Sequence, residues 1–370
     1  MSVPLARRNL LHEKGKLALS LAGIGAALTL VLLLLGFRAG LYATVAAFAD
    51  NLGADLVVGQ SGVQGLFASS SAVPLDVHDV AAAAAEAAEA GHILVAGTIF
   101  TAGNTKTPVL LVGYEPDSAF GRPWSIGDGR PIQSDDEILL DSWLARRTGL
   151  AVGDEIDLLG QRFRVAGLTR ETASWMSPHI FVSLKAASAA LGLDNIVSYH
   201  LLRLAADQDV GRAIAAVESD VAGVDALTPG QVAAADERAL ATILDTPLRV
   251  MVFIGVVIGV AVMSLTAYPA VSDRRREYGV MKALGVSPRR LSWLVVRETA
   301  SRAALGFLAG VGGAYLVAEL IMAVWPQFTI VIKWPSVLQA GVLALFMTVA
   351  AAWLPVRHLQ GIDPVVVFTE

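Results

Sequence analysis

Four long apolar stretches run through the chain, and each is long enough to cross a lipid bilayer. Residues 17–37 carry no charge, and these 21 residues, at a rise of about 1.5 Å each, cover the roughly 30 Å hydrocarbon layer. Residues 250–272 are also uncharged, residues 303–324 carry one charge, and residues 337–354 form the last stretch. The pattern predicts four transmembrane helices.

The first stretch has a second interpretation, because an N-terminal apolar segment after basic residues is also typical of a signal peptide. A signal peptide has an apolar core of roughly 7 to 15 residues followed by a small-residue cleavage site. Residues 17–37 exceed that length, and no convincing cleavage site follows them. We therefore expect an uncleaved membrane helix.

Between the first and second stretches the pattern changes to short segments typical of an α+β domain, which at about 200 residues is large enough for its own core. Two apolar runs split only by Gly160 and Gln161 predict a β-hairpin. Predicted strands cover residues 54–58, 93–100, 108–112, 137–140, 155–158, 162–168, 179–182 and 200–204. Predicted helices cover residues 77–90, 142–148, 184–191 and 209–219.

Composition and charge indicate which parts of the chain lie outside the cytosol. The hydrophobic share is 55% and the charged share is 16%, which is typical of a membrane protein. Residues 38–245 hold 13 Lys and Arg against 26 Asp and Glu, whereas the rest of the chain holds 15 against 7. Because basic segments beside membrane spans stay in the cytosol, we expect an exported middle and cytosolic N- and C-termini in the cytoplasmic membrane.

The predicted fold class is therefore an α-helical membrane protein with four transmembrane helices plus an α+β extracytoplasmic domain between spans 1 and 2. Pro247 is expected in the first turn of the second span, where a proline is tolerated. The nine predicted segments are a cytosolic amphipathic helix (1–16), transmembrane helix 1 (17–40), the α+β domain with helical stalks (41–246), transmembrane helix 2 (247–272), a cytosolic helix and loop (273–298), transmembrane helix 3 (299–324), an outer loop (325–336), transmembrane helix 4 (337–356) and a cytosolic tail (357–370).

The most basic run of the chain, residues 273–290, lies between the second and third apolar stretches. Asp273 is suited to cap a helix, residues 274–284 favour helix, and Gly285 with Pro288 provides a stop. The loop offers no room to bury the apolar edge of this short helix, which suggests docking on a partner protein. A positively charged cytosolic loop without a partner is the alternative.

The order Arg-Arg-x-Glu-Tyr-Gly-Val-Met-Lys-Ala-Leu-Gly-Val-Ser in this run resembles the coupling-helix region of FtsX/MacB-like ABC transporter permeases. In that family the helix sits on the ATPase subunit. Four spans with one large extracytoplasmic domain also match the family, and the tail at residues 361–365 is similar to its C-terminal end. The resemblance implies that the ATPase-coupling residues are Arg274, Arg275, Arg276, Glu277, Tyr278, Met281, Lys282 and Leu284.

Motifs for nucleotide binding and catalysis are absent from the sequence. No Gly-x-x-x-x-Gly-Lys-Ser/Thr loop occurs, and the pair Gly15-Lys16 is followed by leucine. The chain also lacks His-Glu-x-x-His, Gly-x-Ser-x-Gly, cysteine and any set of metal ligands clustered along the sequence. We expect a permease subunit that is not an enzyme and binds no cofactor or metal, with ATP and Mg²⁺ bound by a partner ATPase.

Pairs of glycines four residues apart occur in the first three spans. Such pairs let membrane helices approach closely, although glycine is also common in membrane helices. Four spans alone enclose little, so we expect a second permease copy, as a homodimer or with a paralogue. The residues expected in helix packing are Gly36, Gly40, Gly255, Gly259, Gly306 and Gly310.

Charged residues near the outer boundary of the spans are candidates for substrate contact or gating, and they are Arg38, Arg249 and Glu319. A carboxylate within a span is costly unless it is paired or hydrated, so Glu319 is expected either to pair with an arginine or to snorkel to the headgroups. In the α+β domain, residues 174–179 could contact a hydrophobic or haem-like ligand, although His179 at the start of a strand is also typical of a structural histidine.

The leading functional hypothesis is a membrane subunit that uses ATP hydrolysis by a separate ATPase to export or extract a hydrophobic or amphipathic substrate by mechanotransmission. The alternative is an FtsX-like signal transducer that transports nothing and regulates an extracytoplasmic partner such as a cell-wall hydrolase. Expected partners are the ATPase, a second permease copy, a periplasmic adaptor in the export case, and the lipid bilayer, with no nucleic acid.

Overall fold

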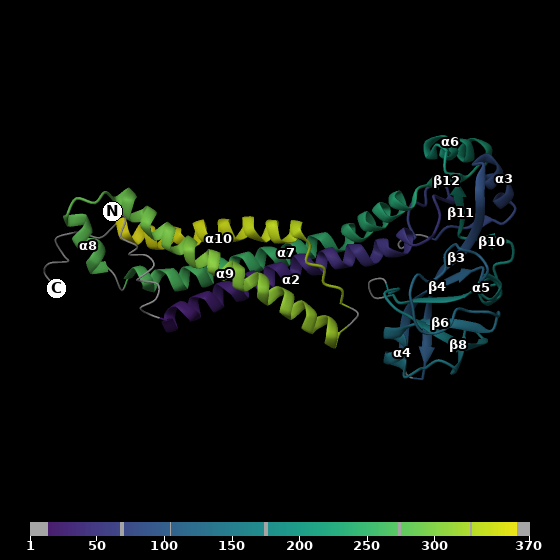
Figure 1. Cartoon of the computed structure of the whole chain (residues 1–370), viewed down its shortest axis with the longest axis horizontal. Helices are drawn as coiled ribbons and strands as arrows, with labels where there is room; N and C mark the ends of the chain where they lie inside the picture. The colour runs from purple at the N-terminus through teal and green to yellow at the C-terminus, as the bar shows by residue number, and fades with distance from the viewer. Residues whose placement is uncertain are drawn as a thin grey trace. The chain divides into compact units, whose positions relative to one another are not determined.

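A computed structural model describes residues 14–66, 70–103, 105–173, 177–272, 275–325 and 328–360. The chain forms two compact units. One, the helical unit, comprises Met1–Gly40 and Thr246–Glu370, and the other, the α+β domain, comprises Leu41–Asp245. Figure 1 labels many of the helices and strands of both units.

The helical unit is built from long helices and one short helix. Four of the helices contain segments long and apolar enough to cross a membrane, with mean hydropathies between 1.7 and 2.5. The prediction of four spans is therefore confirmed. The helices are α2 (Lys14–Asp50), α7 (Pro229–Ser272), α8 (Arg275–Ala283), α9 (Pro288–Val324) and α10 (Trp334–Gln360).

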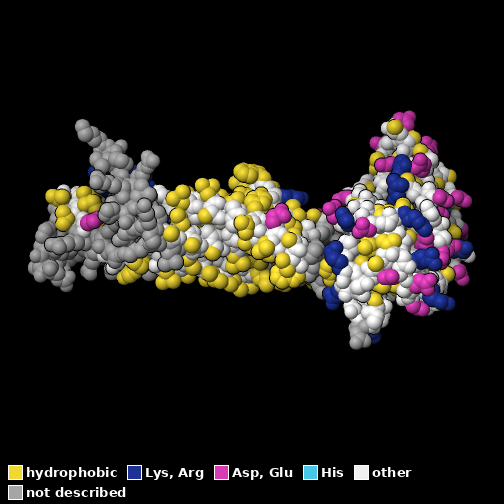
Figure 2. All heavy atoms as spheres, turned by 60° about the horizontal axis from the view of Figure 1, so that its bottom comes forward, with side chains coloured by type: hydrophobic (Ala, Val, Ile, Leu, Met, Phe, Trp, Pro, Cys, Tyr) yellow, Lys and Arg dark blue, Asp and Glu magenta, His cyan; other side chains and the backbone are white. Residues whose placement is uncertain are grey.

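Helix α2 supplies the centre of the helical unit's core. Ile24, Leu28 and Val31 recur at helical spacing and are buried against small or flexible side chains of the other three long helices, such as Ala314 and Met347. Side chains on the outer faces are apolar as well. Figure 2 shows hydrophobic side chains over the helical unit and charged ones concentrated on the α+β domain. An apolar outer face is typical of helices that contact lipid.

The α+β domain is organised around a ten-stranded mixed sheet in the order β12-β1-β11-β3-β4-β9-β6-β8-β5, with β7 paired to β8. The sixteen-residue strand β3 joins the two halves of the sheet, because its first half pairs with β11 and its second half with β4. The strands are β1 (Leu56–Gln60), β2 (Val73–Pro74), β3 (Ala87–Ala102), β4 (Thr105–Tyr114), β5 (Ile126–Gly129), β6 (Glu137–Asp141), β7 (Glu155–Leu158), β8 (Gln161–Thr169), β9 (His179–Ser183), β10 (Ile196–Val197), β11 (Tyr199–Leu204) and β12 (Val224–Leu227).

Four short helices cover the two halves of the sheet. Helices α3 (Val77–Ala84) and α6 (Val210–Asp220) bury their apolar faces against β1, β11 and β12. Helices α4 (Ser142–Thr148) and α5 (Leu184–Leu191) do the same against β4, β6 and β9. The domain ends of α2 and α7 contribute to a third core, which includes Phe48 and Val232.

Two sequence predictions are corrected. Residues 77–90 were expected to be one helix, but α3 ends at Ala84 and residues 87–90 belong to β3, where Ala90 pairs with Leu202. Glu86 adopts a positive φ of 48°, which ends the helix, and the sheet then overrides the helix propensity of alanine. Pro247 was expected in a first turn, but α7 runs continuously from Pro229, so this proline lies inside the helix.

Candidate functional site

The basic segment between the second and third spans forms a separate short helix, α8. Arg274 lies outside the described residues, and Arg275 and Arg276 lie in the first turn of α8. Glu277 is exposed in the same turn, whereas Lys282 lies in the last turn, so both charges complement the helix dipole. Gly285, with a φ of 85°, ends the segment as expected.

One side of α8 packs on the beginning of α9. Tyr278 is only 3% exposed and forms a small core with Leu291 and Val295, and Met281 packs against this core. The expectation that the loop could not bury the apolar edge of its own helix was therefore wrong in part, because the first turns of α9 provide the opposing face. Displacement of α8 would consequently be resisted by these contacts and passed to α9.

Three other apolar side chains of this region are exposed. Leu284 is 79% exposed, Val280 is 38% exposed, and Trp293 on α9 is 61% exposed with the guanidinium of Arg297 lying 5.4 Å from its ring centroid. Exposed leucine and tryptophan beside basic residues are typical of a protein-docking surface. We refer to Val280 and Leu284, which lie four residues apart on one side of α8, as the α8 docking face.

The six predicted packing glycines all lie against other segments of the same chain. A Cβ added at Gly306 would lie 2.4 Å from Ile24 Cγ2, and one at Gly310 would lie 2.9 Å from Leu28 Cβ, so α9 approaches α2 closely. Gly310 also accepts a hydrogen bond of 3.0 Å from the Thr29 hydroxyl. Gly255 faces α2, Gly259 lies closest to Met347 of α10 and also near Ala27 of α2, and Gly36 and Gly40 face the segment that follows α9.

The three charged residues predicted near the outer boundary lie on different helices. Arg38 is half-buried on α2, Arg249 is exposed on α7, and Glu319 is exposed on α9. Within the described ranges Glu319 has no ion-pair partner. Its pairing with an arginine stays a prediction, and a partner within these ranges of the same chain is not found.

The α+β domain contains a cavity of about 280 Å³ beside His179. Phe48 of α2, Ile99 of β3 and Leu110 of β4 line it together with Asp236 of α7. His179 is buried against Phe48 and Trp124, its Nδ1 has no hydrogen-bond partner among the described residues, and burial lowers its pKa to about 3. Of the predicted ligand-contacting run, residues 174–176 lie outside the described residues.

A cluster of three histidines was missed by sequence reasoning. His78 of α3, His92 of β3 and His200 of β11 each place a ring nitrogen within 4.8 Å of the others. Burial lowers the pKa of His200 to about 4 and also lowers the pKa of His92, although Glu115 opposes the shift at His92. The only sequence signal was that four of the six histidines fall within the acidic domain.

Two family models match this chain. Residues 17–220 match the MacB-like periplasmic core domain, and residues 249–364 match the C-terminal region of FtsX-like permeases. The first match covers more than half of the chain and includes the first span and most of the α+β domain. The second match includes α8 and the other three spans.

Curated proteins similar to this chain are named as ABC transporter permeases. Two proteins of Mycobacterium tuberculosis (strain H37Rv), both named as uncharacterized ABC transporter permeases, are 24% identical over 373 residues and 25% identical over 378 residues. Each alignment covers 98% of both chains. The uncharacterized ABC transporter permease YknZ of Bacillus subtilis is 22% identical over 228 residues, which is 58% of this chain and 56% of that protein.

Two of the solved structures similar to this chain are extracytoplasmic domains. The periplasmic region of MacB from Actinobacillus actinomycetemcomitans is 11% identical with a TM-score of 0.38, over 51% of this chain and 95% of that one. The extracellular domain of YknZ from Gram-positive bacteria is 13% identical with a TM-score of 0.37, over 47% of this chain and 99% of that one.

Proposed function

This chain belongs to the FtsX/MacB-like family of ABC transporter permeases, and on that basis we propose that it transmits the conformational change of a separate ATPase to the periplasmic domain. It is a multi-pass membrane subunit, with its α+β domain between the first and second spans. The proposed output is the export or extraction of a hydrophobic or amphipathic substrate. ATP and Mg²⁺ would be bound by the ATPase, not by this chain.

The packing of α8 on α9 is the observation that carries this proposal. The buried contacts of Tyr278 with Leu291 and Val295 fix one side of α8 to α9, while Leu284 stays exposed for a partner. A protein bound to the docking face would therefore push on α9 as well as on α8. Packed helices move as rigid pieces, so a small displacement at one end is transmitted along the whole element.

The path from α9 to the α+β domain follows close helix contacts and continuous helices. The Gly306 and Gly310 face of α9 lies on α2. Helices α2 and α7 both continue across the boundary between the two units, which falls after Gly40 in α2 and after Asp245 in α7. A tilt or shift of either helix in the membrane would thus move its end in the domain.

A second permease copy is part of the proposal. The exposed carboxylate of Glu319 on an apolar span is costly in lipid unless it is paired or hydrated. Contact with a second copy, or with a paralogue, would cover this face of α9 and could provide the partner charge. The termini would lie in the cytosol together with the basic α8 segment.

The cavity beside His179 supports a hydrophobic or amphipathic substrate. Its lining includes the apolar side chains of Phe48, Ile99 and Leu110. A smaller number of polar side chains, among them His179 and Asp236, also line it. Mostly apolar cavities with a few polar groups are typical of small-molecule sites. Because Phe48 lies on α2, movement of this helix would change the shape of the cavity.

The test is purification of the tagged chain from its native membranes with its associated ATPase. We expect Leu284→Asp to lower recovery of the ATPase about tenfold, because a charge replaces an apolar docking contact. Leu284→Met is the matched control and should retain the ATPase. Equal recovery of the ATPase with the Asp and Met variants would contradict the proposal. Unchanged recovery of the ATPase after charge reversal of Arg274, Arg275 and Arg276 would contradict it as well.

The same purified complex separates export from signalling. Export predicts a lipid, lipoprotein or small amphipathic molecule that leaves the complex when Mg-ATP is added. The FtsX-like alternative predicts no released molecule and a periplasmic enzyme, such as a cell-wall hydrolase, whose activity changes with ATP.

A further inference from the structure

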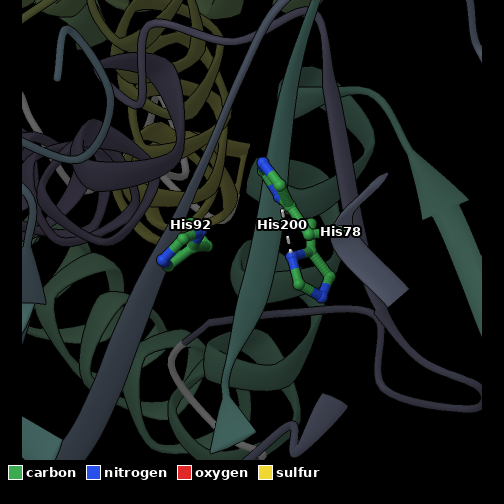
Figure 3. Close-up of side chains that lie close together, drawn as sticks. All are labelled: His78, His92 and His200. Carbon is green, nitrogen blue, oxygen red and sulfur yellow. Dashed lines mark hydrogen bonds between the residues drawn. The ribbon is translucent and has the colours of Figure 1, made fainter. Parts of the chain in front are cut away.

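Three histidines meet on one side of the sheet in the α+β domain (Figure 3). His92 of β3 and His200 of β11 are directly opposite each other in the antiparallel register, so their side chains leave the sheet on the same face. His78 lies in the first turn of α3, which packs over this part of the sheet. Three separate elements thus bring their rings to one point.

The spacing of the ring nitrogens fits a metal ion. Nδ1 of His78 lies 3.3 Å from Nδ1 of His200, and a ligand atom of His92 lies within 4.8 Å of both. Tetrahedral Zn²⁺ with Zn–N bonds of about 2.0–2.1 Å holds its nitrogen ligands roughly 3.3–3.4 Å apart. The Nδ1 atoms of His78 and His200 are already at this separation, and a modest rotation of the His92 ring would bring its nitrogen to a similar distance from both.

The groups around the cluster orient the rings as they do in known metal sites. Nε2 of His200 lies 3.1 Å from the carbonyl oxygen of Pro74, which accepts a hydrogen bond from Nε2–H. This tautomer leaves the Nδ1 lone pair of His200 toward the cluster. Nε2 of His92 lies 3.5 Å from the Glu115 carboxylate, and His92 Nδ1 is buried without a hydrogen-bond partner among the described residues. Carboxylate and carbonyl partners of this kind are typical second contacts of metal-binding histidines.

We propose that His78, His92 and His200 bind a divalent transition-metal ion such as Zn²⁺ in the α+β domain. In the metal-free chain the Nδ1 atoms of His78 and His200 share one proton, and because the proton of His200 is on Nε2, facing Pro74, the donor of this pair is His78. On binding, the metal takes the place of this shared proton, which moves to Nε2 of His78, so that three neutral imidazoles act as ligands. Imidazole ligands suit Zn²⁺, Cu²⁺ and Ni²⁺ better than Mg²⁺ or Ca²⁺.

The ion would join α3 to the β3–β11 pair and keep at least one coordination position open. His200 is fully buried, whereas the side chain of His92 is 12% exposed and His78 is half-buried, so the site is reachable from solvent. The open position would hold water or a donor group from a molecule bound outside the membrane. This inference concerns the α+β domain and is independent of the coupling proposed for α8.

The experiment uses the full chain in lipid nanodiscs, purified without a polyhistidine tag and stripped of metal. Calorimetric titration with Zn²⁺ should give one site per chain, and Co²⁺ should give the visible absorption of a tetrahedral nitrogen-ligated ion. His78→Gln and His200→Gln should remove this site, and Glu115→Gln should weaken binding about tenfold or more. His179→Gln is the matched control and should bind one Zn²⁺ as the unaltered chain does.

Three results would overturn the inference. The first is the absence of a stoichiometric Zn²⁺ site in the unaltered chain, the second is equal Zn²⁺ affinity for that chain and for His78→Gln, and the third is a Co²⁺ spectrum without tetrahedral bands. Because His78 is half-buried, its variant should fold, and unfolding temperatures measured without metal check this. The Co²⁺ spectrum of the unaltered chain needs no variant, and the absence of tetrahedral bands would contradict the proposal by itself.

Discussion

At the scale of single residues, burial determines the chemistry of His179. The imidazole lies among Phe48, Trp124 and Phe181, beside a cavity that Asp236 also lines, and burial lowers its pKa to about 3. In the unfolded chain its pKa is about 6.5. Between these two values the unfolded state binds more protons, so acidification favours unfolding.

We therefore predict that the α+β domain loses about 2 kcal/mol of unfolding free energy through His179 between pH 7 and pH 5. The stability is fully present above about pH 6.5 and falls as the pH approaches 3. Hydrogen exchange of the β9 amides in the full chain measures it. The free energy of opening, derived from the exchange rates, should fall between pH 7 and pH 5 by about 2 kcal/mol less in His179→Gln than in the unaltered chain. An equal pH dependence of this free energy in both proteins would contradict the assignment.

Candidate sites could be predicted only where their residues are consecutive. The predicted coupling segment comes from one run, and in the structure its Tyr278 and Leu284 differ strongly in exposure. Its role in coupling stays a prediction. The histidine cluster could not be predicted, because His78, His92 and His200 are far apart in the sequence. Their meeting depends on the register that pairs His200 with His92, which alternation of apolar residues does not determine.

At the scale of elements, the contact of α9 with α2 depends on the absence of a side chain at Gly306. We predict that Gly306→Ala destabilises the detergent-solubilised chain by about 1–3 kcal/mol, because the added methyl group would overlap Ile24. Gly312→Ala on the same helix is the matched control, since an added Cβ there has no heavy atom within 4 Å.

For Gly312→Ala we expect no loss of stability, or a small gain from the higher helix propensity of alanine. Thermal unfolding followed by intrinsic fluorescence measures both variants. Equal unfolding temperatures would show that α9 does not pack on α2 through this glycine.

Helix α7 contains a proline at the boundary between the two units. Pro247 has no N–H to donate to the carbonyl of Ile243, and the boundary falls between Asp245 and Thr246. We predict that Pro247→Ala slows hydrogen exchange in residues 243–250, because the missing helical hydrogen bond can form. Unchanged exchange would mean that the proline does not loosen the helix.

Most elements could be predicted from periodicity, and the errors have local causes. The hairpin of β7 and β8 and the helices α4 and α5 have the predicted positions because turn residues and apolar spacing agree there. The error at residues 85–90 arose because an alanine-rich strand has the composition of a helix. Short strands such as β5 and β12 carry too few residues for an alternating pattern.

At the scale of the whole molecule, two continuous helices link the membrane spans to the α+β domain. Within the domain the ends of these helices are joined, because the Tyr42 hydroxyl donates a hydrogen bond of 2.7 Å to Asp245. Movement of α2 and α7 would therefore be shared in the domain. For the proposed coupling, α9 and α2 would have to transmit the movement that begins at α8.

A disulfide between α2 and α9 tests whether this movement is needed. A Cβ added at Gly25 would lie 3.5 Å from Cβ of Ala309, which is suitable for a disulfide, and the chain has no other cysteine. The Gly25→Cys/Ala309→Cys pair can thus be locked by oxidation and released by reduction in one preparation. Each single cysteine variant is a control for the substitutions alone.

The most direct measurement is hydrogen exchange of residues 41–50 and 231–245 in the complex with its ATPase, nucleotide-free and in the trapped ATP state. We predict a nucleotide-dependent change in these stalk residues that disappears when the Gly25–Ala309 disulfide is formed and returns on reduction. The same nucleotide-dependent change with the disulfide intact, or no change in the unaltered complex, would contradict transmission through α9 and α2.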